Sequence, residues 1–60
     1  MTFREIEVLL KEDGWYYHHA RGSHYHYRHN SKKSVVVVPY HKGDIRKGTL
    51  NNILKQAGLK

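Results

Sequence analysis

The chain has 60 residues, contains no cysteine and carries a formal net charge of +6. A chain of this length forms one domain with a small core, and without cysteine it has neither a disulfide framework nor a thiolate zinc site. No apolar run approaches the ~20 residues that cross a membrane, and the N-terminus lacks a signal-peptide pattern. We therefore expect one soluble, cytoplasmic domain spanning residues 1–60.

Charge is distributed unevenly along the chain. Four of the five acidic residues lie in the first thirteen positions, whereas the segment from Gly14 to Gly43 has none. The same segment holds all six histidines and six of the seven aromatic residues. This asymmetry favours an anionic partner, either nucleic acid or an acidic protein. The alternative is a solvated charged surface that only keeps the protein soluble.

The first segment, residues 2–13, has the pattern of an amphipathic helix. Apolar residues recur at three-to-four spacing: Phe3, Ile6, Leu9 and Leu10. Thr2 and Glu5 have the spacing of a capping box, and Gly14 suits the position just after a helix end. The sequence therefore predicts one helix that buries a single stripe.

The middle of the chain predicts three strands: Trp15 to Ala20, His24 to His29 and Val35 to Val38. The first two are joined by a turn at residues 21–23, and a polar turn at residues 30–33 precedes the third. The unbroken valine run predicts a third strand that is central or covered on both faces. Pro39 is expected to end it, because proline cannot donate to the ladder.

The last segment predicts a second amphipathic helix after a loop at residues 40–47. Its apolar positions follow helical spacing: Leu50, Ile53, Leu54 and Ala57. Thr49 is the expected cap and Gly58 the expected terminator. The predicted order α-β-β-β-α gives an α+β fold, with two helices on one face of a three-stranded antiparallel sheet. This arrangement resembles the double-stranded RNA-binding domain.

A closer resemblance follows from motifs laid along that order. They are Gly14-Trp15, Gly22-Ser23-His24, Tyr27, Val37-Val38-Pro39-Tyr40-His41, Lys47-Gly48-Thr49-Leu50 and Ile53-Leu54-Lys55-Gln56-Ala57-Gly58-Leu59. Together they resemble the HicA toxin family over nearly the whole chain. The resemblance implies the toxin of a bacterial toxin–antitoxin pair that cuts messenger RNA and is held inactive by a HicB antitoxin.

His24 is the candidate catalytic residue. Gly22 lets the backbone turn tightly or approach a phosphate, because it has no Cβ. His24 then opens a strand, so its ring is held by a fixed scaffold, and imidazole transfers protons in both directions near its ordinary pKa of ~6.5. RNA supplies its own nucleophile, the 2′-hydroxyl. From the residues alone, His24 is either a catalytic group or a hairpin histidine that only stacks or forms hydrogen bonds. The resemblance implies that His24 is the family's catalytic histidine.

Further candidates surround His24 or follow the third strand. The expected RNA-binding residues are Arg21, Gly22, Ser23, Arg28, His41, Lys42, Arg46 and Lys47. His41 matches a family motif and is either a second proton-transfer group or a residue that orders its loop. The remaining histidines, His18, His19 and His29, are interpreted as extra basic, stackable surface. Trp15 and Tyr27 are expected in the core, while Tyr16 and Tyr25 are either core or base-stacking residues.

A metal site is the alternative use of six histidines. His24 and His26, two residues apart on a strand, form a possible zinc pair, with His18 or His41 as a third ligand. However, no carboxylate in this region orients the rings, and the surrounding cations oppose a dication. Oxygen ligands for magnesium are also lacking. We therefore expect no metal and no other cofactor.

Together with these observations, the resemblance to the HicA family implies a metal-independent endoribonuclease with RNA and an acidic HicB-type antitoxin as its partners. The toxin alone is expected to be a monomer and to form a larger hetero-oligomer with the antitoxin, in a bacterial or archaeal cytoplasm. Two alternatives stay open: a non-catalytic RNA-binding module and a small basic domain that binds only an acidic protein.

Overall fold

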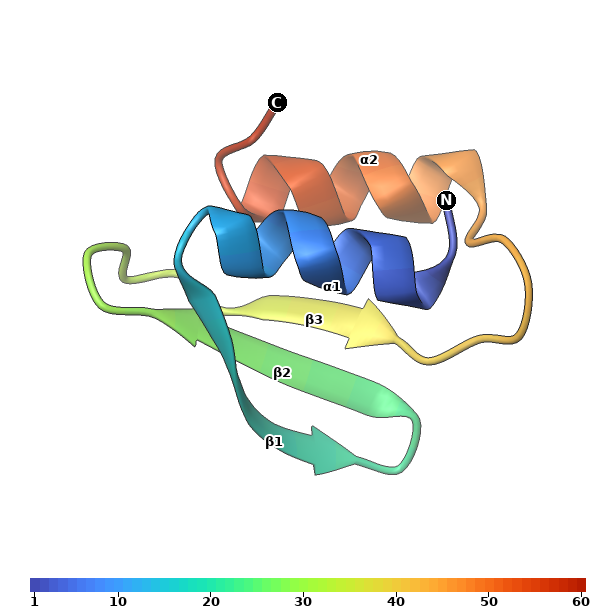
Figure 1. Cartoon of the computed structure of the whole chain (residues 1–60), viewed down its shortest axis with the longest axis horizontal. Helices are drawn as coiled ribbons and strands as arrows, with labels where there is room; N and C mark the ends of the chain where they lie inside the picture. Colours follow the sequence, from blue (N-terminus) through green and yellow to red (C-terminus); the bar gives the residue numbers. More distant parts are fainter.

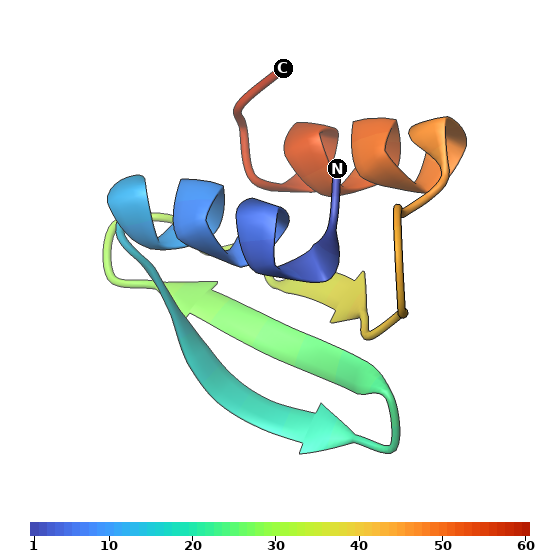
Figure 2. The ribbon, with the colours of Figure 1, turned by 45° about the vertical axis from the view of Figure 1, so that its right-hand side comes forward.

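Two helices cover one face of a three-stranded antiparallel sheet, and the other face of the sheet is uncovered (Figures 1 and 2). The computed structural model describes all residues, 1–60. The elements are α1 (Phe3–Glu12), β1 (Trp15–Arg21), β2 (His24–His29), β3 (Val36–Pro39) and α2 (Lys47–Gln56). The predicted α+β fold is thus confirmed. No helix is both long and apolar enough to cross a membrane.

Helix α1 begins and ends as its sequence predicts. The Thr2 hydroxyl accepts from the Glu5 amide at 3.2 Å, and the Glu5 carboxylate accepts from the Thr2 amide at 2.8 Å. These two bonds complete the capping box, and the hydrogen bond from the Thr2 backbone amide is the main cause that lowers the pKa of Glu5 below its ordinary value. Gly14 follows the helix with φ +101°, and a Cβ on it would lie 2.7 Å from the His29 ring. A glycine is therefore required there by both conformation and space.

Strands β1 and β2 form a hairpin with a β-bulge. The turn consists of Gly22 and Ser23 alone, so β1 extends one residue further than predicted. Tyr17 pairs with Tyr27, but the next pair joins His19 with His26, which leaves His18 as an extra residue. In such a bulge, two residues of one strand oppose one residue of the other.

Strand β3 differs from its prediction in place and in coverage. It begins at Val36 and lies at the sheet edge, because β2 is the central strand. Only Val36 and Val38 are buried, whereas Val37 on the other face is half-exposed. Pro39 is the last strand residue, and the following amide, that of Tyr40, donates to the Ser23 carbonyl at 2.6 Å. A proline is tolerated at the end of this edge strand.

The start of helix α2 also corrects the sequence prediction. Thr49 lies inside the first turn, and the N-cap is Arg46, whose side chain makes no capping bond. The preceding loop determines this earlier start: Ile45 is buried, and its amide donates to the Met1 carbonyl at 2.7 Å. The chain therefore enters the helix before it reaches Thr49. Gly58 follows the helix end with φ +74°, as predicted.

The core lies between the helices and the sheet. It comprises Ile6, Leu10, Trp15, Tyr27, Val36, Val38, Ile45, Ile53 and Ala57. Trp15 and Tyr27 are buried as predicted, while Tyr16 is exposed and Tyr25 packs at the edge of the core. The Tyr27 hydroxyl donates to Glu7 at 2.7 Å. Burial, and then this bond, raises the pKa of Tyr27 above its ordinary value, so the hydroxyl stays a neutral donor.

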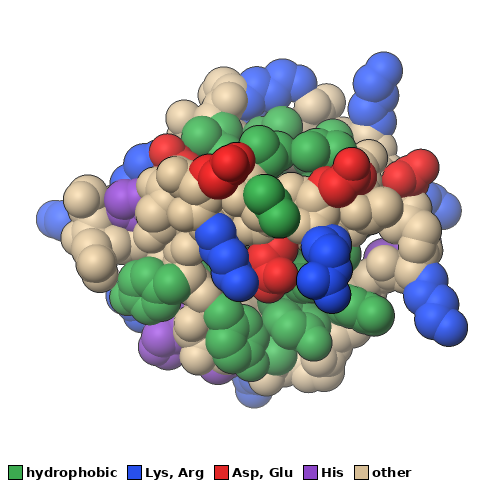
Figure 3. Space-filling view, in the orientation of Figure 1, with side chains coloured by type: hydrophobic (Ala, Val, Ile, Leu, Met, Phe, Trp, Pro, Cys, Tyr) green, Lys and Arg blue, Asp and Glu red, His purple; other side chains and the backbone are tan.

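The acidic side chains lie in the helix layer and its loops, not on the sheet. In Figure 3 they are seen over and just below the helices, and none is visible along the lower part of the molecule, where β1 and β2 lie. Asp13 accepts from the Lys32 ammonium at 2.7 Å and from the Trp15 indole at 3.1 Å. Several carboxylates thus stabilise the fold itself.

Asp13 links stability to pH. The hydrogen bond from Lys32 is the main cause that lowers its pKa below the ordinary value of 3.8. The unfolded chain therefore takes up this proton first, so the stabilisation is complete above the ordinary pKa and is lost as the pH falls from that value through the lowered pKa of the folded state. We expect the free energy of unfolding, from urea titrations, to decrease between about pH 5 and about pH 3. Asp13→Asn should flatten that dependence, whereas Glu12→Gln, at an exposed position of α1, should leave it steep.

Candidate active site

His24 stands at an open corner of the sheet. It is the first residue of β2, it is exposed, and it pairs with Arg21 on β1 and with Pro39 on β3. Gly22 in the adjoining turn has φ +58°, and no heavy atom lies within 4 Å of the position of a Cβ. The glycine therefore serves the turn conformation, and the space beside it is free for a ligand. The backbone of His24 is thus held between two neighbouring strands, and its side chain is accessible to solvent.

The pairing of β2 with β3 brings the loop after Pro39 next to this turn. The bond from the Tyr40 amide to the Ser23 carbonyl extends the pairing beyond the strand end. The Tyr40 ring packs edge-on against Phe3, with centroids 5.2 Å apart, and also contacts Tyr25. These contacts fix the direction in which the chain leaves β3 toward His41.

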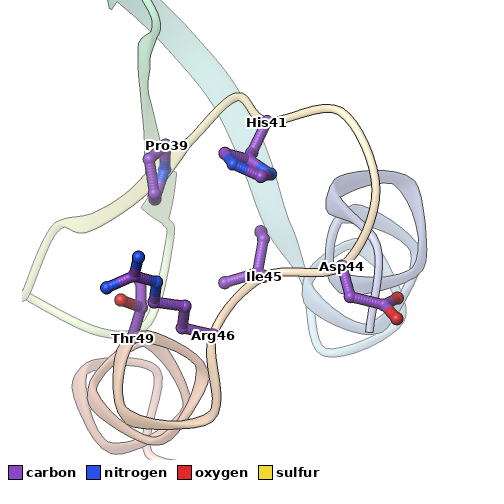
Figure 4. A pocket seen from close by; sticks show the side chains of 6 residues that line it. All are labelled: Pro39, His41, Asp44, Ile45, Arg46 and Thr49. Carbon is purple, nitrogen blue, oxygen red and sulfur yellow. The ribbon is translucent and has the colours of Figure 1, made fainter.

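His41 and Arg46 line a shallow hollow of about 130 Å³ between β3 and the start of α2. In Figure 4 the His41 ring and the Arg46 guanidinium face this hollow from two sides, while the Asp44 carboxylate points away from it. A second hollow, of about 240 Å³, is lined by His41 and Lys42 together with residues at the start of α1, among them the cationic Arg4 and the acidic Glu7. Cationic and imidazole groups thus face both hollows, a suitable setting for phosphate groups.

The predicted site residues fall into two groups at one end of the molecule. The turn group comprises Arg21, Gly22, Ser23 and His24, and the loop group comprises His41, Lys42, Arg46 and Lys47. The hairpin turn, the loop after β3 and the start of α2 all lie on the right-hand side of Figures 1 and 2. Arg28 is separate: it lies on the same strand face as His24 but four residues along β2, or roughly 13 Å away.

The sequence indicates basic surface for His18, His19 and His29 alike, but the structure gives them different roles. His29 is structural, because its Nε2 donates to the Asp13 carbonyl at 2.6 Å and its Nδ1 accepts from the Ser31 amide. Its ring also packs on Trp15 at 5.2 Å, so its interpretation as basic surface was wrong. His18 and His19, in contrast, are exposed and touch each other beside the bulge.

The comparison with protein families is decisive for the identity of the chain. The model described as HicA toxin of bacterial toxin–antitoxin matches residues 3–59. The chain belongs to the HicA toxin family. This HicA family member is therefore a toxin of a toxin–antitoxin system. The matched region includes both groups of site residues. No match was found among curated proteins.

Proposed function

We propose that this HicA toxin is an endoribonuclease that cleaves messenger RNA without a metal ion and uses His24 for proton transfer. The observation that carries the proposal is the position of His24: an exposed imidazole at a strand start, held between two strands and paired with Arg21. The chain from Gly14 to Gly43 has no carboxylate, so the groups around His24 suit a phosphate and oppose a divalent cation.

The chemistry uses the nucleophile that RNA already contains. The His24 imidazole accepts the proton of a 2′-hydroxyl, whose oxygen attacks the adjacent phosphorus while the bond to the 5′-oxygen breaks. Protonation of that leaving oxygen, by His24 or by water, completes the step. Arg21 stabilises the charge that develops on the phosphoryl oxygens, as a guanidinium does for phosphates in general. One positioned base and one cation account for slow cleavage.

The remaining predicted residues position the RNA backbone. Ser23 offers a hydroxyl and an amide at the turn, and Gly22 leaves the space beside it open. The loop group supplies further phosphate contacts through His41, Lys42, Arg46 and Lys47. Phosphate contacts of this kind position the strand without reading its sequence.

The partner that silences the toxin is, in this proposal, an acidic antitoxin of the HicB type. An acidic surface that covers the turn group and the loop group would bury His24 and neutralise the surrounding cations. Opposite charge also speeds the encounter of the two proteins. We propose a monomeric toxin that enters a larger hetero-oligomer with its antitoxin in a bacterial or archaeal cytoplasm.

A cleavage assay with two matched RNA substrates tests this proposal. We expect cleavage of an all-ribose strand to continue in excess EDTA, because no step uses a metal ion. A strand with 2′-deoxyribose at the cleaved positions should stay intact there, because it lacks the nucleophile. Binding of both strands without cleavage of either would instead identify a non-catalytic RNA-binding module, and loss of activity in EDTA with recovery on one metal would show the histidines to be ligands.

A further inference from the structure

The open face of the sheet has an unusual set of side chains for a surface exposed to water. Three cross-strand pairs of β1 and β2 lie on it: Arg21 with His24, His19 with His26, and Tyr16 with Arg28. Val37 and Pro39 of β3 continue the same face beside β2. Both helices pack on the opposite side (Figures 1 and 2). The face therefore presents planar rings and cations without a single carboxylate.

The centre of this face is a cluster of three imidazoles. The rings of His19 and His26 are stacked, with centroids 4.3 Å apart and an interplanar angle of 15°. His18, the extra residue of the bulge, contacts His19 edge-on, and their Nδ1 atoms are 2.8 Å apart. Partial desolvation, and then the charges of His26 and its neighbours, lower the pKa of His19. This ring is therefore neutral at neutral pH and suited to stacking.

The same geometry argues against a metal site in this cluster. Two rings stacked face to face do not direct their nitrogens toward a common point. The contact between His18 and His19 joins nitrogen to nitrogen at hydrogen-bond distance, which leaves no space for an ion between those atoms. No group of three His, Asp or Glu side chains in the structure is arranged to hold a metal. The cluster offers flat ring surfaces instead.

We propose that the open sheet face binds an unpaired segment of RNA and leads it to His24. Bases stack on Tyr16, His19 and His26, and phosphates contact the guanidinium groups of Arg21 and Arg28. The proposal rests on the proposed ribonuclease function and adds the surface that holds an unpaired segment of its substrate. Unpaired bases can stack on protein rings, whereas the bases of a duplex are already stacked on each other.

The charge on the face and its continuity with His24 support this occupant over a protein. Arg21 pairs with His24 at one end and Arg28 pairs with Tyr16 at the other, so a strand along the face meets a cation at each end. Planar rings flanked by cations are the combination that binds single strands with little sequence preference. Arg28 belongs to this face although it lies apart from the turn group. In this proposal it contacts a phosphate further along the same RNA strand.

Binding of a 12-nucleotide 2′-O-methyl RNA, followed by fluorescence anisotropy, tests the proposal. This probe lacks a free 2′-hydroxyl, so affinity is measured whether or not the protein cleaves RNA. We expect the double variant His19→Ala/His26→Ala to raise Kd about tenfold. Lys55→Ala, at an exposed position of α2, should change Kd less than about twofold. A duplex of equal length should bind more weakly and respond little to the double variant.

Two further variants separate stacking from charge and from misfolding. His19→Tyr keeps a ring at the centre of the face and should retain an affinity within about twofold of the wild type. Arg28→Ala should weaken binding and reduce its salt dependence by about one unit of slope. Melting temperatures identify any variant that fails to fold, and Arg28→Ala then still tests the face, because an unchanged Kd for that variant would contradict the proposal.

Two results would overturn the inference. One is an unchanged Kd for a folded double variant. The other is a loss of antitoxin affinity with normal RNA affinity, which would make the face a protein-docking surface. Failure of the ribonuclease proposal gives a different result, because a protein that does not cleave would still bind the methylated strand through this face.

Discussion

His24→Ala is expected to reduce RNA cleavage by a factor of about 10² to 10⁴, the usual contribution of one general acid or base. Alanine cannot accept the 2′-hydroxyl proton, and His24 is the histidine of β2 that lies next to the hairpin turn, with Arg21 and Pro39 as its strand partners. Because His24 is exposed, the substitution leaves the core intact. The same variant should no longer arrest growth when it is expressed without an antitoxin.

The measurement is the rate of RNA cleavage by wild type and variant purified in parallel, with melting temperatures as the folding control. Lys55→Ala, which removes a cation from an exposed position of α2, should cleave at nearly the wild-type rate. Equal rates for wild type and a folded His24→Ala protein would show that another group carries out the proton transfer. His41, which faces both hollows, would then be the next candidate.

Trp15→Ala is expected to remove a large part of the protein's stability at 25 °C. The indole is almost completely buried, donates to Asp13 at 3.1 Å and lies 5.7 Å below the Lys32 ammonium. Truncation of a buried tryptophan costs about 3–5 kcal/mol. A domain of 60 residues has a total stability of only about 3–9 kcal/mol. The cost is therefore comparable to everything that holds the chain folded.

Urea titration followed by circular dichroism measures this effect. Tyr16→Ala is the matched control, because it removes the neighbouring aromatic ring from the open face and should cost less than about 1 kcal/mol. A Trp15→Ala protein with a midpoint close to that of the wild type would mean that the core is held mainly by α2 and β3. Comparable losses for the two variants would show that the open face also stabilises the fold.

Most of the fold follows from local patterns in the sequence. The capping box at Thr2, the apolar stripe of α1 and the glycine turn of the hairpin each depend on neighbours within a few residues, and each is found as predicted. The position of β3 depends on distant partners. Four consecutive valines have the same propensity in a central strand and in an edge strand, and only the pairing with β2 decides between them. The start of α2 likewise depends on the anchoring of Ile45 in the core.

The candidate site was predictable to a similar depth. Gly22-Ser23-His24 forms a turn and the start of a strand, and both depend only on neighbouring residues, so the sequence predicts them. The catalytic role of His24 stays a prediction. The cluster at His19 was hidden, because strict alternation along β1 would place this residue on the same face as Tyr17. The bulge at His18 shifts the alternation of side chains between the two faces by one residue. No glycine, turn residue or proline in this strand predicts the bulge. A signal existed only in composition: three adjacent ring residues, Tyr17 to His19, opposite an alternating His/Tyr strand.

The location of the carboxylates in the helix layer has a consequence for how the toxin meets its partners. The carboxylates of Glu5, Glu7 and Asp13 accept hydrogen bonds from the Thr2 amide, the Tyr27 hydroxyl and the Lys32 ammonium, so they are held in the helix layer and its loops, away from the open sheet face. The positive electrostatic potential of that face therefore steers a diffusing polyanion toward it before any contact forms. In our proposal, RNA and an acidic antitoxin are both drawn by this positive charge, and both contact Arg21 and His24. We expect the association rates of both partners to fall as the salt concentration rises.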